Sequence, residues 1–385
     1  MISKLIAILF ENALIVKKEF TVSSVLNSKN CTGKNIIIMA GGTGGHVFPA
    51  LAVARCFKQK GATVSWVGTK LGIETKIVPA EFEIDYIKVS GVRKKNLRQK
   101  LSFPMKLISA ILQAKSILKK RQAHIVIGFG GYASGPGGIA AYLSKIPLII
   151  HEQNAIPGMT NRYLSKISNL TLLAFPYSKL KAKSKVIGNP LREEIKELNN
   201  NLKIYNKTEF NILILGGSLG AKILNDVVPK ALEKLKTRQG FKVIHQSGEK
   251  LYSETIGNYS SITTGYEIKK FIDNMAEVYK WADIIICRSG ASTVSEVAAA
   301  GIPAIFIPYP HAVDDHQYHN AKFLADAKAA VIFRQSELSP NKLAEVLDEL
   351  FTKPEILDEM SKNSKNSAVI NATEEVASVV LKYLQ

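Results

Sequence analysis

Two glycine-rich turns constrain the fold of this chain more than any other feature of its sequence. Residues 41–45 follow the apolar run 36–40, and residues 216–220 follow the apolar run 212–215, about half a chain later. Adjacent glycines do not continue a strand, and glycine tolerates the backbone angles and close approach that a phosphate-facing turn demands. Each turn is therefore typical of a buried strand that leads into a helix, and the pair predicts two nucleotide-type domains.

The length of 385 residues also favours two domains. In each half, short β-branched runs alternate with segments that carry apolar residues at helical spacing, which predicts an α/β fold with doubly wound parallel sheets. The polar stretch after Asn189-Pro190 is typical of a domain linker. We therefore expect an extension over residues 1–34, domains over 35–190 and 191–367, and a C-terminal helix over 368–385 that packs on the first domain.

The apolar runs of the first 34 residues are interrupted by Glu11 and Asn12. They are much shorter than the roughly 20 residues that span a membrane. We interpret this segment as an extension, with a membrane-contacting segment as the alternative.

The formal net charge of +19 favours polyanionic partners such as nucleic acid, anionic lipid or phosphorylated substrates. The charge is uneven, because residues 90–121 contain many Lys and Arg and no Asp or Glu. The three cysteines lie far apart and no His cluster at zinc spacing surrounds them, so we expect no structural metal.

The common nucleotide motifs do not fit either turn. Val47 fills the third glycine position of G-x-G-x-x-G, and neither turn is followed by Gly-Lys-Ser or Gly-Lys-Thr. We also find no acidic residue beside Gly68 to bind a ribose hydroxyl, as an NAD site would require. What remains is a helix N-terminus, whose N–H groups and dipole suit a diphosphate.

His46 directly follows the first turn. An imidazole with an ordinary pKa near 6.5 can accept a proton from a sugar hydroxyl at neutral pH, so His46 is a candidate general base. The alternative is a helix-start histidine that only bonds to the backbone.

Polar residues are densest over 287–296, directly after an apolar strand. Ser289 or Ser292 could cap a helix whose first turn faces an anion, and Glu296 could accept two ribose hydroxyls; the alternative is plain helix capping.

Downstream, residues 311–320 contain three His and two Asp. A metal site is the minor interpretation there, because Gln317 and its neighbours suit sugar hydroxyls equally well.

Taken together and in order, residues 41–46, 130–136, 151–154, 188–192, 216–221 and 288–296 resemble the MurG family, which belongs to glycosyltransferase family 28. These bacterial enzymes transfer N-acetylglucosamine (GlcNAc) from UDP-GlcNAc to lipid I, the undecaprenyl-pyrophosphoryl N-acetylmuramic acid (MurNAc) pentapeptide. The resemblance covers the chain from about residue 35 to its end.

The resemblance implies the GT-B glycosyltransferase fold, with two Rossmann-like domains that face a cleft. It implies inverting transfer to the C4 hydroxyl of MurNAc, which forms lipid II for peptidoglycan synthesis, with no cofactor and no essential metal. His46 would be the base, with Glu152 as a rival, and a backbone amide of the segment 271–275 would meet the uracil edge. The expected substrate contacts are Thr43, Gly44, Gly45, Asn154, Arg192, Ser218, Ile272, Ala291, Ser292, Thr293, Val294, Ser295, Glu296 and Gln317, with Gly130, Gly131 and Tyr132 on the acceptor side.

The basic stretch fits a peripheral position on the cytoplasmic face of the bacterial membrane. Met105, Ile108 and Ile111 would meet anionic lipid together with Arg93, Lys94 and Lys95. The alternative is a core-facing amphipathic helix with a solvated basic rim. We expect UDP-GlcNAc and lipid I as partners, cell-wall synthesis proteins as further candidates, and no nucleic acid. Other functions that remain open are another lipid glycosyltransferase, a UDP-sugar 2-epimerase, and a basic binding module without catalysis.

Overall fold

The computed structural model describes residues 30–89, 103–176, 180, 183–200, 203–205, 208–235, 240–262 and 265–384. It divides at Arg192/Glu193 and again at Ala368/Val369. The N-terminal unit ends its first stretch at Arg192 and resumes at Val369, whereas the C-terminal unit is Glu193–Ala368. Most of the proposed extension, and the basic residues Arg93, Lys94 and Lys95, lie outside the described residues.

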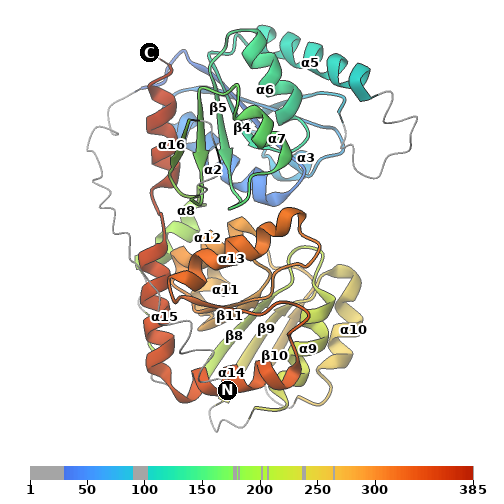
Figure 1. Ribbon diagram of the computed structural model, residues 1–385, viewed down its shortest axis with the longest axis vertical. Coiled ribbons are helices and arrows are strands. Elements are labelled where there is room, and N and C mark those ends of the chain that lie inside the picture. The colour runs from blue at the N-terminus through green and yellow to red at the C-terminus, as the bar shows by residue number, and fades with distance from the viewer. Residues whose placement is uncertain are drawn as a thin grey trace. The chain divides into compact units, whose positions relative to one another are not determined.

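The N-terminal unit is a parallel sheet with helices on both faces (Figure 1). Its strand order is β3-β2-β1-β4-β5-β6-β7. The strands are β1 (Asn35–Ala40), β2 (Thr63–Gly68), β3 (Glu83–Tyr86), β4 (Ile125–Gly130), β5 (Leu148–Glu152), β6 (Leu170–Leu173) and β7 (Ser184–Val186). The helices are α2 (Gly44–Gln59), α3 (Glu74–Ile77), α5 (Phe103–Lys120), α6 (Ser134–Leu143), α7 (Met159–Leu164) and α16 (Ala372–Leu381).

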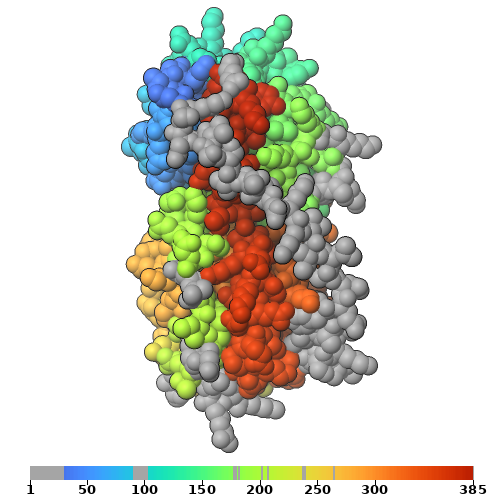
Figure 2. Space-filling model, turned by 90° about the vertical axis from the view of Figure 1, so that its left-hand side faces the viewer, coloured from blue at the N-terminus to red at the C-terminus, as the bar shows by residue number. Residues whose placement is uncertain are grey.

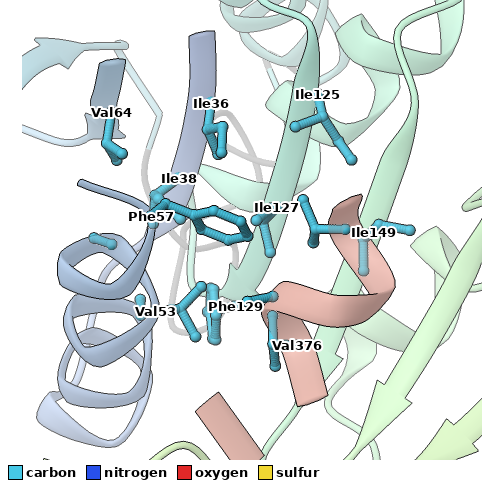
Figure 3. Packing of buried hydrophobic residues seen from close by; sticks show 14 of the residues in the cluster. Ile36, Ile38, Val53, Phe57, Val64, Ile125, Ile127, Phe129, Ile149 and Val376 are labelled. Carbon is cyan, nitrogen blue, oxygen red and sulfur yellow. The ribbon is translucent and has the colours of Figure 1, made fainter. Parts of the chain in front are cut away.

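Alternation along β1 explains the two faces of this sheet. Ile36 and Ile38 pack with Phe57 of α2 and Val376 of α16 in one buried cluster, shown in Figure 3. Ile37 and Met39 point to the opposite face, where they pack with buried residues of α5 and α6. Because α16 supplies Val376 to the first cluster, the N-terminal unit takes part of its core from the far end of the chain. The opposite side of α16 lies at the surface of its unit (Figure 2).

The C-terminal unit repeats the design with the strand order β10-β9-β8-β11-β12-β13, again parallel. The strands are β8 (Glu209–Leu215), β9 (Gly240–Gln246), β10 (Tyr266–Lys269), β11 (Ile284–Cys287), β12 (Ala304–Phe306) and β13 (Ala330–Ile332). The helices are α8 (Glu193–Lys196), α9 (Lys222–Leu232), α10 (Tyr252–Asn258), α11 (Met275–Trp281), α12 (Ala291–Ala300), α13 (His316–Asp326), α14 (Pro340–Thr352) and α15 (Pro354–Ser367).

In both sheets the strand order reverses beside the strand that precedes a glycine turn. The reversal lies between β1 and β4 in one sheet and between β8 and β11 in the other. Open α/β sheets bind ligands outside the carboxyl ends of their strands at such a switch point. Each unit therefore offers one favoured place for a ligand, and both glycine turns lie there.

Candidate active site

The first turn joins β1 to α2. Gly42 has φ +86°, a conformation that favours glycine. Thr43 precedes the helix in an extended conformation and its side chain caps no N–H group, and the first turn of the helix contains no acidic residue. The N–H groups of Gly44 and Gly45 therefore begin a helix whose positive end is not neutralised by its own cap.

The turn after β4 is in backbone contact with this first turn. A Cβ atom at Gly131 would lie 2.3 Å from the carbonyl oxygen of Gly41, and one at Gly130 would lie 3.0 Å from Nε2 of His46. The contact follows from the pairing of β1 with β4, which sets Ala40 opposite Gly130. Tyr132 continues this turn with an exposed side chain.

His46 is held by the backbone of the first turn. Its Nδ1 lies 3.0 Å from the carbonyl oxygen of Gly41 and 3.3 Å from Oγ1 of Thr43. Because a carbonyl oxygen can only accept, Nδ1 donates the hydrogen bond and carries the proton of the neutral ring. Nε2 then carries the lone pair, as a general base on that nitrogen requires.

Glu152, the rival base, ends β5 with its carboxylate buried and heavily bonded. Oε1 accepts from the backbone and side-chain nitrogens of Asn154 at 2.9 and 3.2 Å. Oε2 accepts from the backbone nitrogen of Gly158 at 3.0 Å and from Nδ2 of Asn161 at 2.9 Å. Both oxygens of this carboxylate already accept hydrogen bonds that order a loop, so the geometry favours His46 over Glu152.

His151 lies beside Glu152 and is fully buried. Nε2 donates to the carbonyl oxygen of Gly188 at 3.0 Å, and Nδ1 accepts from Nε2 of Gln153 at 3.2 Å. Burial lowers the pKa of His151 to about 4, because the charged ring would lose its hydration, and the bond to Gly188 opposes this effect. His151 therefore holds the start of the 188–192 motif as a neutral ring.

Arg192, at the end of that motif, lies over the ring of Phe48, with its guanidinium carbon 5.2 Å from the ring centroid. Phe48 belongs to α2 and also packs against Gly44, where a Cβ atom would lie 3.1 Å from its ring. The structure thus brings Arg192 to the first turn of α2.

The backbone of the second turn, after β8, packs closely against the residues that follow β9. A Cβ atom at Gly220 would lie 1.9 Å from the carbonyl oxygen of Ser247, and Gly217 has φ +83°. Gln246 connects this turn to the segment after β10. Its Nε2 donates to the carbonyl oxygen of Gly217 at 2.8 Å, and its Oε1 accepts from the backbone nitrogen of Ile272 at 2.8 Å. Ser218 remains exposed at the tip of the turn.

The backbone nitrogen of Ile272 donates to the buried side chain of Gln246. Local propensities do not reveal such a contact, because Gln246 ends β9 whereas Ile272 lies in the segment between β10 and α11. The uracil contact expected of the segment 271–275 stays a prediction.

The polar run 287–296 forms the start of α12. Gly290 occupies the N-cap position in an extended conformation, and no side chain caps the helix there. Ser289 Oγ instead donates to the carbonyl oxygen of Gln317 at 2.8 Å, and Ser295 Oγ donates to that of Ala291 at 3.0 Å. The plain capping interpretation is therefore not observed. The N–H groups of the first turn, with Ser292, Thr293 and Val294, face the carboxyl edge of the sheet without a side-chain cap.

Glu296 and Gln317 are each oriented by a neighbour. Tyr279 Oη donates to Oε2 of the largely buried Glu296 at 3.0 Å. Oε1 of Gln317 accepts from the backbone nitrogen of Tyr309 at 2.9 Å, so a sugar contact would use its Nε2.

Side chains of the His- and Asp-rich loop have partners within the loop and outside it. His316 Nδ1 donates to the carbonyl oxygen of Val313 at 2.9 Å, and Asp315 pairs with Arg334 at 2.6 Å. Among the described residues, no group of three or more His, Cys, Asp or Glu could hold a metal ion.

Helix α5 differs from the sequence interpretation at one position. Met105 and Ile108 are 77% and 58% exposed, but Ile111 packs against the buried cluster under α5, and Leu112 is exposed in its place at 61%. The reason is helical spacing, since Ile111, Ala114 and Leu118 share the core-facing side. The sequence reasoning also missed Tyr142 of α6 and Tyr163 of α7, both exposed on helices packed in series with α5. No helix in the described ranges is long and apolar enough to cross a membrane.

The comparisons first define the class of fold. The chain is similar to the calicheamicin glycosyltransferase CalG4, with a TM-score of 0.65 and 15% identity over 91% of this chain and 98% of that one. At this identity the likeness shows the fold alone, which is the GT-B architecture of two Rossmann-like domains.

Closer similarities define the family. Residues 36–172 match the glycosyltransferase family 28 N-terminal domain, and residues 211–376 match its C-terminal domain. A Shewanella sp. (strain ANA-3) protein, named UDP-N-acetylglucosamine–N-acetylmuramyl-(pentapeptide) pyrophosphoryl-undecaprenol N-acetylglucosamine transferase, is 46% identical over 91% of this chain and 97% of its own length. Acinetobacter baumannii MurG has a TM-score of 0.76 and 40% identity, covering 91% of this chain and 99% of that one. The chain belongs to glycosyltransferase family 28 and, within it, to the MurG family, and it is a glycosyltransferase.

Replacing Gly130 by Ala should lower turnover about tenfold or more. The new Cβ would strain a backbone at φ +102° and press on Nε2 of His46. Steady-state kinetics check this, with Gly257→Ala as the control because that exposed helical glycine has no atom within 4 Å of its Cβ position. Full activity in Gly130→Ala would mean that the His46 ring does not need its observed place.

His151 should make the N-terminal unit sensitive to acid. Its pKa is lower in the folded state, about 4, than the ordinary 6.5, so the unfolded chain binds more protons between these values. The free energy of unfolding should have its full value above pH 6.5, decrease as the pH falls toward 4, and stay at the lower value below that. The total decrease should be on the order of 3 kcal/mol. Hydrogen exchange of β5 amides at several pH values measures this. His151→Gln should flatten the pH dependence, whereas the exposed His311→Gln should not.

Proposed function

We propose that the chain transfers GlcNAc from UDP-GlcNAc to the C4 hydroxyl of MurNAc in lipid I and so forms lipid II. The name of the Shewanella relative describes this transfer, and its similarity extends over nearly the whole chain. The observation in the structure that carries the proposal is the bond from Nδ1 of His46 to Gly41, because it presents the basic Nε2 at the switch point of the N-terminal sheet.

The proposed reaction is a single displacement with inversion. The C4 oxygen of the acceptor forms a bond to the anomeric carbon while the bond from that carbon to the UDP oxygen breaks. The proton of the hydroxyl passes to Nε2 of His46, and the electron pair of the broken bond leaves with UDP. A neutral imidazole whose Nε2 carries the lone pair suits this role, and no metal or cofactor is part of the proposal.

The C-terminal unit supplies the donor contacts in this proposal. Negative charge grows on the departing diphosphate, and the first turn of α12 around Ala291 and Thr293, together with the Ser218 turn, would stabilise it. Glu296, oriented by Tyr279, would accept the ribose hydroxyls, and Gln317 would donate to the sugar. Arg192 and Asn154, with the 43–45 turn, would complete the substrate contacts.

The proposed location is the cytoplasmic face of the bacterial membrane, at which the enzyme docks peripherally. Met105, Ile108 and Leu112 form an exposed apolar row on α5, and Lys106, Lys115 and Lys119 border it. Apolar side chains framed by lysines bind anionic interfaces through both burial and charge. Tyr142 and Tyr163, on α6 and α7, add exposed aromatic residues to this surface.

A UDP-release assay tests the proposed reaction. UDP should appear from UDP-GlcNAc when a lipid I analogue is present and not from UDP-GlcNAc alone, which separates transfer from epimerase chemistry. Changing His46 to Ala should lower kcat by about 10² or more with little change in KM for UDP-GlcNAc, since only proton transfer is lost. Turnover of this variant within a few fold of wild type would remove His46 from the role of base, and Glu152→Gln is the parallel test of the rival.

Vesicle binding tests the docking surface. Ile108→Glu together with Leu112→Glu should weaken sedimentation with anionic vesicles by about tenfold or more, because two exposed apolar contacts are lost and like charge is added. Raising the salt concentration should also weaken binding of the wild-type protein. Ile204→Glu is the control, since Ile204 is exposed in the C-terminal unit. Salt-independent binding, or equal binding by the double variant, would contradict this surface.

A further inference from the structure

Glu74 is a buried acid that no motif of the sequence singled out. It is the first residue of the short helix α3, six residues after β2 ends at Gly68, and its exposed fraction is 0%. Oε1 accepts from the backbone nitrogen of Thr69 at 2.8 Å and from Oγ1 of Thr69 at 3.0 Å, and Oε2 accepts from the backbone nitrogen of Gly42 at 3.2 Å. Burying a carboxylate costs free energy unless hydrogen-bond donors surround it, and these bonds offset that cost.

The chain makes room for this carboxylate with three glycines. A Cβ atom would lie 2.6 Å from a Glu74 atom at Gly41, 2.8 Å at Gly68 and 2.0 Å at Gly72. These glycines come from the ends of β1 and β2 and from the loop before α3. The sequence interpretation found no acidic residue beside Gly68, but the chain folds back so that Glu74 lies there.

One peptide group connects Glu74 to His46. The N–H of Gly42 donates to Glu74, and the C=O of the same peptide group, which belongs to Gly41, accepts from Nδ1 of His46. A peptide group is planar, and in the trans form its N–H and C=O point in opposite directions. The group is therefore held at both ends, and turning it would break both bonds. A carboxylate on the N–H also polarises the group, which strengthens the C=O as an acceptor.

We propose that Glu74 is a positioning residue for His46 that acts through the Gly41–Gly42 peptide group. By holding that group, Glu74 keeps the Gly41 carbonyl aimed at Nδ1 and so selects the ring tautomer whose Nε2 can accept a proton. Neutral imidazole side chains in water prefer the opposite tautomer, with the proton on Nε2, and in that form the ring cannot act as a base at Nε2. The consequence for turnover rests on the proposed function, whereas the choice of tautomer does not.

The test is Glu74→Gln, which keeps the size and shape of the side chain. The amide can offer its oxygen to Thr69 or to Gly42 but not to both, because its nitrogen can only donate. Selectively ¹⁵N-labelled histidine, assigned with a His46 variant, reports the tautomer of His46 in the full-length protein. The matched control is Glu81→Gln, the same change at an exposed carboxylate of the same unit that pairs with Lys58.

We expect wild-type protein and Glu81→Gln to show His46 protonated on Nδ1 at neutral pH. Glu74→Gln should shift the signal toward the Nε2-protonated form and lower kcat by about tenfold to a hundredfold, with KM for UDP-GlcNAc within about twofold of wild type. Should Glu74→Gln fail to fold, Thr69→Val removes one donor from Oε1, and a smaller shift in the same direction is expected.

An unchanged His46 tautomer in a folded Glu74→Gln protein would overturn the proposal, whatever happens to kcat, because a loss of activity would then have another cause. If the tautomer shifts but neither Glu74→Gln nor His46→Ala slows turnover, the positioning role of Glu74 stands and the assignment of His46 as base fails. The two ideas are therefore separable by the same pair of measurements.

Discussion

The contact between the backbone of Gly131 and that of Gly41 is the constraint on which the arrangement around His46 depends. A side chain at Gly131 would meet the backbone of Gly41 and force apart the carboxyl ends of β1 and β4, the strands at which the sheet order reverses. The contact places Gly130 against the ring of His46 and leaves α2 to start directly beside it. Glycine is therefore needed here for close approach as well as for backbone angle.

In both units a polar side chain holds the glycine turn by a hydrogen bond to its backbone. In the N-terminal unit this side chain comes from α3, which follows β2, the neighbour of β1. In the C-terminal unit it comes from β9, the neighbour of β8. Glu74 binds the N–H of Gly42 in the N-terminal unit, and Gln246 binds the C=O of Gly217 in the C-terminal unit. A carboxylate can only accept hydrogen bonds, whereas an amide can also donate. The side chain of Gln246 therefore donates to its turn and at the same time accepts from the backbone nitrogen of Ile272. The likeness of the turns in sequence therefore hides two distinct anchoring schemes.

Much of the fold could be predicted from the sequence, because the spacing of apolar residues and the positions of the glycine turns indicated the same elements. The alternation of apolar runs and helical spacing predicted two parallel sheets, and glycines marked where β1 and β8 end. The family resemblance supplied the GT-B architecture, and the comparisons confirm both the family and the fold. The proposed substrate contacts stay predictions, since the structure describes the protein alone.

What could not be predicted depends on contacts between distant segments. The sequence analysis passed over Glu74 because nothing local shows that the chain folds it back to Gly68. It assigned Ile111 to the exposed row because one helix viewed alone has no core direction, whereas packing against the sheet selects Ala114 and Leu118 as its companions. It did not reveal the bond from the backbone nitrogen of Ile272 to Gln246, because these residues are 26 positions apart in the sequence. Each miss is a tertiary contact that overrides a local pattern.

The position of Val376 in the cluster around Ile36 and Phe57 has a consequence for biosynthesis. During translation the ribosome releases β1 and α2 first and α16 only after the whole C-terminal unit has been made. The N-terminal unit therefore waits, with part of its apolar surface uncovered, while the C-terminal unit already has every residue of its own sheet. The residues that make up the N-terminal core are therefore complete only when synthesis of the chain is nearly finished.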